Sequence, residues 1–299
     1  MKNISSFLIA VLCVVFCSNQ AWAQISFGKD GLRYHVLEGQ NVSVCFDDED
    51  SLFLSGRVEI PERIVNPADD MVYNVIAIAD TAFKGCDLID VLVLPASIKF
   101  FGAHAIDHCF NLKAYEVAQG STTFKTIDGV LFSADGSWLI SCPTGKGGEY
   151  KVPAGVKMMA AAAFSTCKNF RKVTLPEGLK EVPDYAFYEC WSLAEVNFPR
   201  SLERIGEYAF DGTILQFLVF DRNLKSIGSH AFDRTSMVEC MCYGSTPAVM
   251  GDDVFGNDMN YTRLYVPSGA TARYKNTAWS IFPTIYEGRS SRRWKSSNR

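Results

Sequence analysis

The chain has 299 residues, 48% hydrophobic and 21% charged, so it carries enough apolar side chains for a large core and is not a disordered sequence. The net charge of -4 conceals an asymmetry, because residues 289–299 contain five basic residues and no acidic one. Without that segment and Lys2, 23 basic residues stand against 33 acidic ones. A body this acidic argues against nucleic acid as a partner. We expect 289–299 to be a disordered, frayed end, with contact to an anionic surface as the alternative.

The N-terminus has the pattern of an export signal. Lys2 precedes an apolar run from Phe7 to Cys17, and Ala21-Trp22-Ala23 supplies the small residues of a cleavage site. We predict a signal peptide over 1–23 and export through the general secretory pathway, to the cell surface or the medium, with the periplasm as the alternative. The run is too short to span a membrane, and no later segment approaches the length of a spanning helix, so we expect no transmembrane segment.

An Ala-Phe dipeptide, or a variant of it, recurs along the chain. The steps between the second residues are 23, 58, 23, 23, 22 and 23, so one interval holds a normal step plus an insertion of 35 residues. A fixed period in the twenties indicates a solenoid, in which each coil buries its apolar face against its neighbours. The dipeptides are Ala82-Phe83, Ala105-Ile106, Ala163-Phe164, Ala186-Phe187, Ala209-Phe210, Ala231-Phe232 and Val254-Phe255.

Each coil also carries a short strand. Val173 and Leu175 alternate with Lys172 and Thr174, which is typical of a strand buried on one face. The next residue ends the strand and is usually proline, which has no amide to donate to a ladder. We predict nine coils with short parallel strands, and short helical turns around Ala-Phe. The strand-ending residues are Pro61, Pro95, Ala118, Pro153, Pro176, Pro199, Asp221, Tyr243 and Pro267.

A stack of coils needs covers at both ends. In segment 24–53, Asp30–Leu37 and Val42–Cys45 have the pattern of an antiparallel pair, suited to an N-terminal cap. We predict the solenoid itself over 54–288. At its C-terminal end an aromatic and aliphatic cluster is suited to closing the stack: Tyr274, Trp279, Phe282 and Ile285.

The insertion falls at about 119–150 and carries a hairpin signal. Val130–Ser133 and Trp138–Ser141 flank Asp135-Gly136, a dipeptide typical of tight hairpin turns. We expect this β-hairpin to project from one flank of the solenoid.

The chain resembles the BspA-type leucine-rich-repeat family of bacterial secreted and surface proteins. The similarity is carried by the repeated Ile-Gly-x-x-Ala-Phe-x-x-Cys unit, as in Phe101–Cys109, by Ile127–Phe132, and by Arg263–Gly269 with the Tyr274 and Trp279 that follow. It extends from about Ile25 to Gly288. The resemblance implies a parallel-stranded solenoid in a surface or secreted binding protein, some members being adhesins for host proteins. It transfers no functional residue, because the shared motif consists of core positions.

Eight cysteines remain after the predicted cleavage, and most follow the repeat. Cys86, Cys109, Cys167 and Cys190 share one slot, which Thr213 and Thr235 occupy in the next two coils. Because a slot that accepts Cys or Thr selects size, and because stacked coils do not bring Cβ atoms to disulfide distance, we predict buried free thiols there. Cys240 and Cys242 are likewise predicted to face the core. Cys45 and Cys142 lie outside the register, and their pairing stays open.

We predict neither catalysis nor a resident metal or cofactor. Cys240-Met241-Cys242 does not supply the four convergent ligands of a zinc site, and neither does the His104–Cys109 segment. Asp47–Asp50 is interpreted as a solvated acidic loop, with calcium as the alternative. Outward strand positions show no cluster of carboxylates; instead Glu149, Lys172 and Glu195 alternate in sign, as in a charge ladder. A carbohydrate-active enzyme of β-helix type is the weakest alternative.

Two function classes remain: a binding or adhesion module for an extracellular protein or glycan, and an envelope spacer without a specific ligand. We expect a monomer in either case. The later coils place apolar residues at outward strand positions, and a charged rim beside them is typical of an interaction site. The predicted binding residues are Phe217, Val219, Glu239, Met241, Arg263 and Tyr265. Two alternatives stay open: the C-terminal segment covers this face, or a one-residue slip in register turns Phe217 and Val219 inward.

Overall fold

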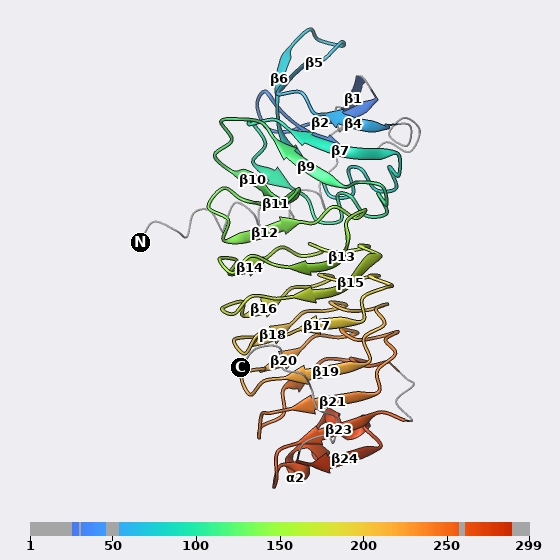
Figure 1. The fold of residues 1–299 in the computed structure, drawn as a ribbon. Helices are drawn as coiled ribbons and strands as arrows, with labels where there is room; N and C mark the ends of the chain where they lie inside the picture. The colour runs from blue at the N-terminus through green and yellow to red at the C-terminus, as the bar shows by residue number, and fades with distance from the viewer. Residues whose placement is uncertain (1–25, 30, 46–53, 257–260, 289–299) are drawn as a thin grey trace.

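The computed structural model describes residues 26–29, 31–45, 54–256 and 261–288. They form an elongated stack of coils that runs from an N-terminal sheet to a small C-terminal cap (Figure 1). The predicted signal peptide, the basic segment 289–299 and Asp47–Asp50 lie outside the described residues. In the part of the chain that is described, no helix is long and apolar enough to cross a membrane.

Nine parallel strands form the first wall of the stack, three in each of three sheets. Each strand ends one or two residues before a position predicted to end it, so the nine predicted coils and the solenoid fold are confirmed. A tenth strand, β24 (Thr284–Glu287), pairs parallel with the ninth. The nine are β4 (Gly56–Glu59), β7 (Ile89–Leu94) and β9 (Ala114–Val117); β13 (Gly147–Lys151), β15 (Asn169–Thr174) and β17 (Glu195–Asn197); and β19 (Phe217–Phe220), β21 (Glu239–Cys242) and β23 (Arg263–Val266).

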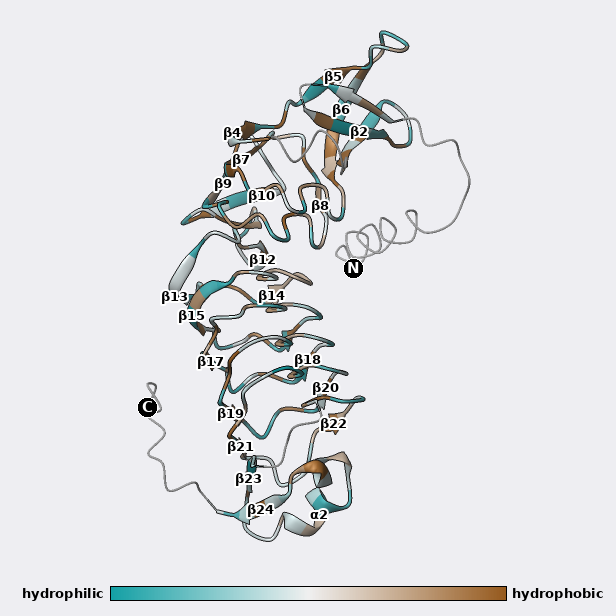
Figure 2. Cartoon of the chain, turned by 90° about the vertical axis from the view of Figure 1, so that its right-hand side faces the viewer, coloured by the Kyte–Doolittle hydropathy of each residue, from teal (hydrophilic) through white to brown (hydrophobic). Residues whose placement is uncertain are grey.

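Two-residue strands form the second wall, on the other side of the coils (Figure 2). They pair parallel from coil to coil, so each coil is a flattened loop with one strand on each wall. The strands are β14 (Met158–Met159), β16 (Glu181–Val182), β18 (Arg204–Ile205), β20 (Ser226–Ile227) and β22 (Val249–Met250).

The turns around Ala-Phe are not the short helices expected from the sequence. In each coil the residue before Ala-Phe has a positive φ, from 47° to 59°, and another left-handed residue follows three or four positions later. Left-handed residues interrupt a helical run, so these segments stay as turns. Within the described residues, the only helices are α2 (Thr271–Lys275) and the 3-10 helix η2 (Ala278–Ile281), both in the C-terminal cap.

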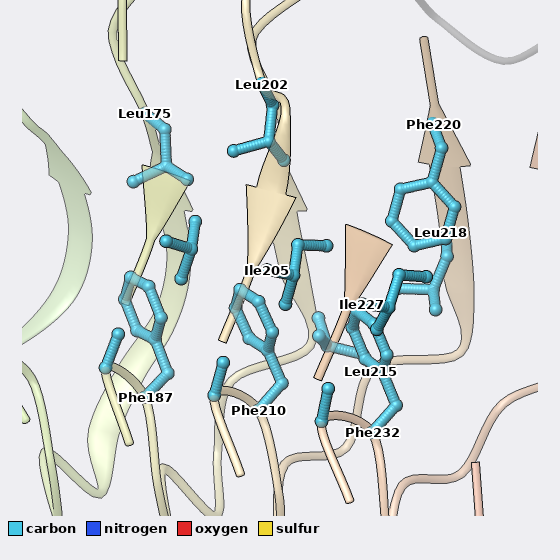
Figure 3. Close-up of a cluster of buried hydrophobic side chains, with 14 of the residues drawn as sticks. Leu175, Phe187, Leu202, Ile205, Phe210, Leu215, Leu218, Phe220, Ile227 and Phe232 are labelled. Carbon is cyan, nitrogen blue, oxygen red and sulfur yellow. The ribbon is translucent and has the colours of Figure 1, made fainter. Parts of the chain in front are cut away.

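Phenylalanine rings stack through the coil interior, as the Ala-Phe repeat predicts. The Phe187 and Phe210 centroids lie 5.0 Å apart, and those of Phe210 and Phe232 5.2 Å apart, with nearly parallel planes. Leucine and isoleucine side chains from both walls close around these rings (Figure 3). The stacking buries the apolar face that a single coil leaves exposed.

An antiparallel unit covers the N-terminal end. Strands β1 (Ser26–Lys29), β2 (Leu32–Val36) and β3 (Asn41–Cys45) pair in order, with Val36 opposite Val42. β3 then pairs parallel with β6 (Val72–Ile78), which also pairs with β5 (Arg63–Val65) and β8 (Phe100–Phe101). The hairpin is thereby joined to the first coils by backbone hydrogen bonds.

The C-terminal cluster packs as expected for a cover. Tyr274, Trp279 and Phe282 are buried, and Ile285 packs against the same core. The Trp279 indole donates to the Ala248 carbonyl at 2.8 Å, and the Tyr274 hydroxyl donates to the Gly244 carbonyl at 2.8 Å.

The insertion forms the predicted hairpin but does not project. Strands β10 (Phe124–Ile127), β11 (Val130–Ser133) and β12 (Trp138–Ser141) are antiparallel, and β12 pairs parallel with β14 of the second wall. Because β12 continues that wall, the hairpin lies inside the stack, and residues 130–132 are fully buried. One set of side chains, Val130, Phe132 and Leu139, packs into the C-terminal core, whereas Phe124, Leu131 and Ile140 pack into the N-terminal core. The insertion therefore separates two hydrophobic clusters.

The repeated cysteine slot selects a hydrogen-bond donor as well as a size. The thiols of Cys109 and Cys190 donate to the carbonyl of a phenylalanine in the preceding coil, at 2.8 and 3.0 Å. Thr213 and Thr235 instead donate to the phenylalanine carbonyl three residues before them, both at 2.8 Å. All eight described cysteines are free thiols. Burial raises the pKa of Cys86 to about 11, which keeps that thiol unreactive.

Candidate functional site

The predicted binding residues share the outward side of β19, β21 and β23. Leu218 and Phe220 point inward and are buried, so the 22-residue step does not shift the register. The outward residues form two rows across the strands. One row aligns Phe217, Glu239 and Arg263, and the other aligns Val219, Met241 and Tyr265.

The sequence prediction was wrong about the exposure of two of these six residues. Met241 and Glu239 were predicted to be exposed, but each is only 2% exposed. Met241 lies between Val219 and Tyr265 on the neighbouring strands. Glu239 lies between Phe217 and Arg263, whose Nη1 donates to its carboxylate at 3.2 Å. The sequence pattern identified the direction of these side chains but not how far their neighbours cover them.

The tenth strand extends the surface that the sequence predicts. Tyr286 on β24 is 43% exposed and stacks on Tyr265 with ring centroids 5.2 Å apart. Phe217, Val219 and Tyr265 are half-buried. We define the apolar face as Phe217, Val219, Met241, Tyr265 and Tyr286, in which Met241 is the floor and the other four form the accessible part.

The other outward rows of the first wall are polar or are bridged by charge. On β15 and β17, Lys172 pairs with Glu195 at 2.6 Å, as the predicted charge ladder requires. On the first sheet, Arg57 of β4 binds Glu116 of β9 through two hydrogen bonds of 2.6 and 2.8 Å.

That bridge spans the intervening strand β7, whose outward residues Val91 and Val93 are half-buried. The Glu116 carboxylate also raises the pKa of the Arg57 guanidinium. In contrast, among the described residues no ion pair crosses the Val219–Tyr286 row of the apolar face.

The described residues assemble no metal centre. No three histidine, cysteine or carboxylate side chains of the described ranges lie close enough together to hold an ion. His104 is engaged by Asp107, whose carboxylate lies 2.7 Å from Nδ1. An open cavity of about 390 Å³ lies beside the N-terminal sheet, and its lining includes Leu32, Tyr34 and Val58. Arg57 also lines this cavity, but its guanidinium is already bound by Glu59 and Glu116.

A second feature lies on the turns and was missed from the sequence. Tyr185, Tyr208 and His230 each precede Ala-Phe in consecutive coils, and we call them the turn row. Their ring centroids are 5.1 and 4.8 Å apart, with planes within 13° of parallel. The sequence does place an aromatic residue directly before Ala-Phe in these three coils. Other coils have other residue types at that position, and in a turn the alternation of side chains does not reveal which way a side chain points.

The repeat itself identifies the family. The model of the BspA type leucine rich repeat region matches residues 70–138 and 148–272 in six copies, which is more than half of the chain. The chain belongs to the BspA type leucine-rich-repeat family. The gap between the two matched ranges falls in the insertion, where the regular coil is interrupted. No curated protein matches the sequence of this family member.

Several solved structures are similar to this BspA-type protein. Pneumococcal vaccine antigen PcpA is 17% identical, with 89% of this chain and 99% of that chain covered and a TM-score of 0.49. A leucine-rich repeat protein from Bacteroides ovatus is 19% identical, with coverage of 88% and 76% and a TM-score of 0.41. The leucine-rich repeat protein of T. pallidum is 19% identical, with coverage of 89% and 100% and a TM-score of 0.42. At these scores the likenesses carry no argument about function.

Proposed function

We propose that this BspA-type protein is exported and acts outside the cytoplasm as a binding or adhesion module, with the apolar face as its docking surface for another protein. The observation that carries the proposal is the contrast within one wall. The middle strands present paired charges, and an ion pair spans the first sheet. In the last described sheet the Arg263–Glu239 pair lies in the row of Phe217, whereas among the described residues no ion pair crosses the row of Val219, Met241, Tyr265 and Tyr286.

The composition of the apolar face favours a protein over a glycan as its partner. Protein interfaces have an apolar, aromatic centre and a polar rim. The rim here is supplied by Arg263, which is 52% exposed in its side chain and held by Glu239. The buried Met241 gives the face a fixed floor, so little side-chain entropy is lost at that position on binding.

Phe217 and Tyr265 are the residues to truncate, because each row of the face contains one of them and both are only half-buried. We expect the Phe217→Ala/Tyr265→Ala variant to lose roughly 1 to 3 kcal/mol of affinity, which is about five- to 150-fold in Kd. The measurement is a titration of purified extracellular matrix proteins and matrix glycans against wild type and variant.

The matched control is Thr174→Ala/Asn197→Ala, two outward positions of the polar middle sheet. Circular dichroism and melting temperature check that each variant is folded. Equal affinity of wild type and the Phe217/Tyr265 variant would remove the apolar face from consideration. Absence of binding to any matrix protein or glycan would favour the envelope-spacer alternative.

Export has its own test. We expect the mature protein in native cells to begin at Gln24, as determined by N-terminal sequencing, because Ala21 and Ala23 supply the cleavage pattern. Protease treatment of intact cells should degrade a surface protein, whereas a periplasmic one would be protected. An uncleaved N-terminus in the cell lysate would contradict export by this route.

A further inference from the structure

The turn row occupies a backbone position that disfavours large side chains. Tyr185, Tyr208 and His230 have φ of 57°, 52° and 55°. For a residue other than glycine the left-handed region costs roughly 1 to 2 kcal/mol, and a bulky residue there is an outlier.

The chain does use glycine at a comparable place. The second left-handed position of the same turn holds Gly85, Gly212 and Gly256 in three of the described coils, whereas the first position holds glycine in none of them. The left-handed conformation at the first position also occurs at Thr81 and Ala162, so it belongs to the repeated turn, and the turn row differs from the other coils by its stacked rings.

The polar atoms of the row are not used within the protein. The rings stack on one another, so their faces are covered and their edges form a file along the axis of the solenoid. Among the described residues, none forms a hydrogen bond with the hydroxyl of Tyr185 or of Tyr208. Nδ1 of His230 is buried and makes no hydrogen bond, and the Asp233 carboxylate lies 3.6 Å from it, within ion-pair distance of a protonated imidazole. A buried polar atom without a hydrogen bond calls for an explanation.

The surroundings of the row exclude an anionic ligand. Acidic residues occupy the position just before the row, at Asp184 and Glu207, and the row continues at Asp253. The nearby bases are already bound by carboxylates: Arg204 donates to Asp184 at 3.1 Å, and Arg234 donates to Asp211 at 2.8 Å. A polyanion would meet these acidic residues without a free cation to pair with.

The row also offers no open strand edge to a peptide. The backbone amides of Tyr185, Tyr208 and His230 donate to carbonyls of the next coil, at 2.9, 3.0 and 3.0 Å. Addition of a peptide strand requires unpaired backbone groups, so an extended peptide has nothing to pair with here. The file is one side chain wide, which is too narrow for the apolar centre of a protein interface.

We propose that the turn row binds an uncharged linear glycan lying along the solenoid axis. Sugar hydroxyls both donate and accept, and they pair with phenol hydroxyls and carboxylates, the groups that the tyrosines of the row and the acidic residues beside them carry. The ring spacing of 5.1 and 4.8 Å offers one polar tip per coil to a polymer that repeats its hydroxyls along its length. Each residue of the row lies three positions after a strand of the second wall along the chain, whereas the apolar face lies on strands of the first wall (Figure 2). The proposal is thus independent of the apolar face.

The test uses a variant that keeps the stack and removes only the hydroxyls. Tyr185→Phe/Tyr208→Phe should retain the melting temperature of wild type, because both rings stay in place. The probes are the neutral hexasaccharides of cellulose, mannan and xylan, titrated calorimetrically against the chain beginning at Gln24. We expect wild type to bind at least one of them and the variant to bind it about tenfold more weakly, as the loss of two hydrogen bonds to the ligand predicts.

The matched control is Tyr243→Phe, which removes the hydroxyl of a 40% exposed tyrosine outside the row and should leave binding unchanged. The proposal is overturned if wild type binds none of the three hexasaccharides at millimolar concentration, or if the double variant binds as tightly as wild type. Binding of heparin that depends on the two hydroxyls would overturn the ligand class. Because these probes are sugars and the partners of the apolar face are proteins, either proposal can fail without the other.

Discussion

Replacing Phe210 by alanine removes the middle ring of the stack in the C-terminal core. Phe210 is fully buried and lies between Phe187 and Phe232, with Phe198 against its edge at 5.4 Å. Truncating a buried phenylalanine costs about 3 to 5 kcal/mol, depending on how far the surroundings collapse. Hydrogen bonds on both walls fix the coil spacing here, so collapse is restricted, and we expect a loss near the upper end, about 4 to 5 kcal/mol.

The assay is equilibrium urea unfolding, followed by circular dichroism and by tryptophan fluorescence. Phe255→Ala serves as the comparison, because the parallel ring stack ends at Phe255, which stacks on Phe232 at 5.7 Å and meets Phe282 and Trp279 of the cap edge-on. It should cost less than Phe210→Ala, since Phe210 lies between two parallel rings. Phe210→Leu, which keeps most of the volume, should cost only about 1 to 2 kcal/mol. A loss below about 2 kcal/mol for Phe210→Ala, or equal losses at Phe210 and Phe255, would refute the view that the ring stack couples the coils.

Two further predictions concern acid and thiols. The Ser133 hydroxyl, with the amide and hydroxyl of Ser137, lowers the pKa of Asp135 to about 2, so this carboxylate stabilises the hairpin turn above pH 4 and ceases to do so as pH falls toward 2. Asp135→Asn should therefore lower the melting temperature at pH 7 but not at pH 2, and a difference that is constant with pH would contradict this. Alkylation after denaturation without reductant should label every cysteine of the repeat register, as read by mass spectrometry; label that appears only after reduction would reveal a disulfide. Those cysteines are Cys86, Cys109, Cys167, Cys190, Cys240 and Cys242.

The sequence predicts the inward half of each coil well, because burial imposes a strict pattern there. Alternation along the strand places Leu218 and Cys240 in the core, and both are buried. The Cys/Thr exchange at one slot predicts packed thiols, and the structure adds that side chains in this slot donate to a backbone carbonyl, which is that of a phenylalanine for Cys109 and Thr213. Repetition makes these inferences strong, since every coil must meet the same neighbours.

Prediction was weaker wherever the environment comes from another coil or from outside the repeat. The period identifies Met241 as outward, but whether it is covered depends on the sizes of Val219 and Tyr265, which belong to different coils. The insertion was expected to project because its sequence breaks the period. It lies in the stack instead, since both faces of its strands are apolar and each faces a different core.

The two proposed sites lie at the positions of the coil that the stack leaves free to vary. Inward positions are constrained by the stack, so a new binding property has to come from outward strand positions or from the turns. Outward strand residues form rows across the strands, with neighbours in a row about 4.8 Å apart, and two such rows side by side suit broad contact with a protein, as at the apolar face. Turn residues form single files along the axis, which suit a narrow polymer, as at the turn row. On these two proposals, one solenoid carries surfaces for two kinds of partner on different parts of the coil, and we expect substitutions on either surface to leave the stack that supports both unchanged.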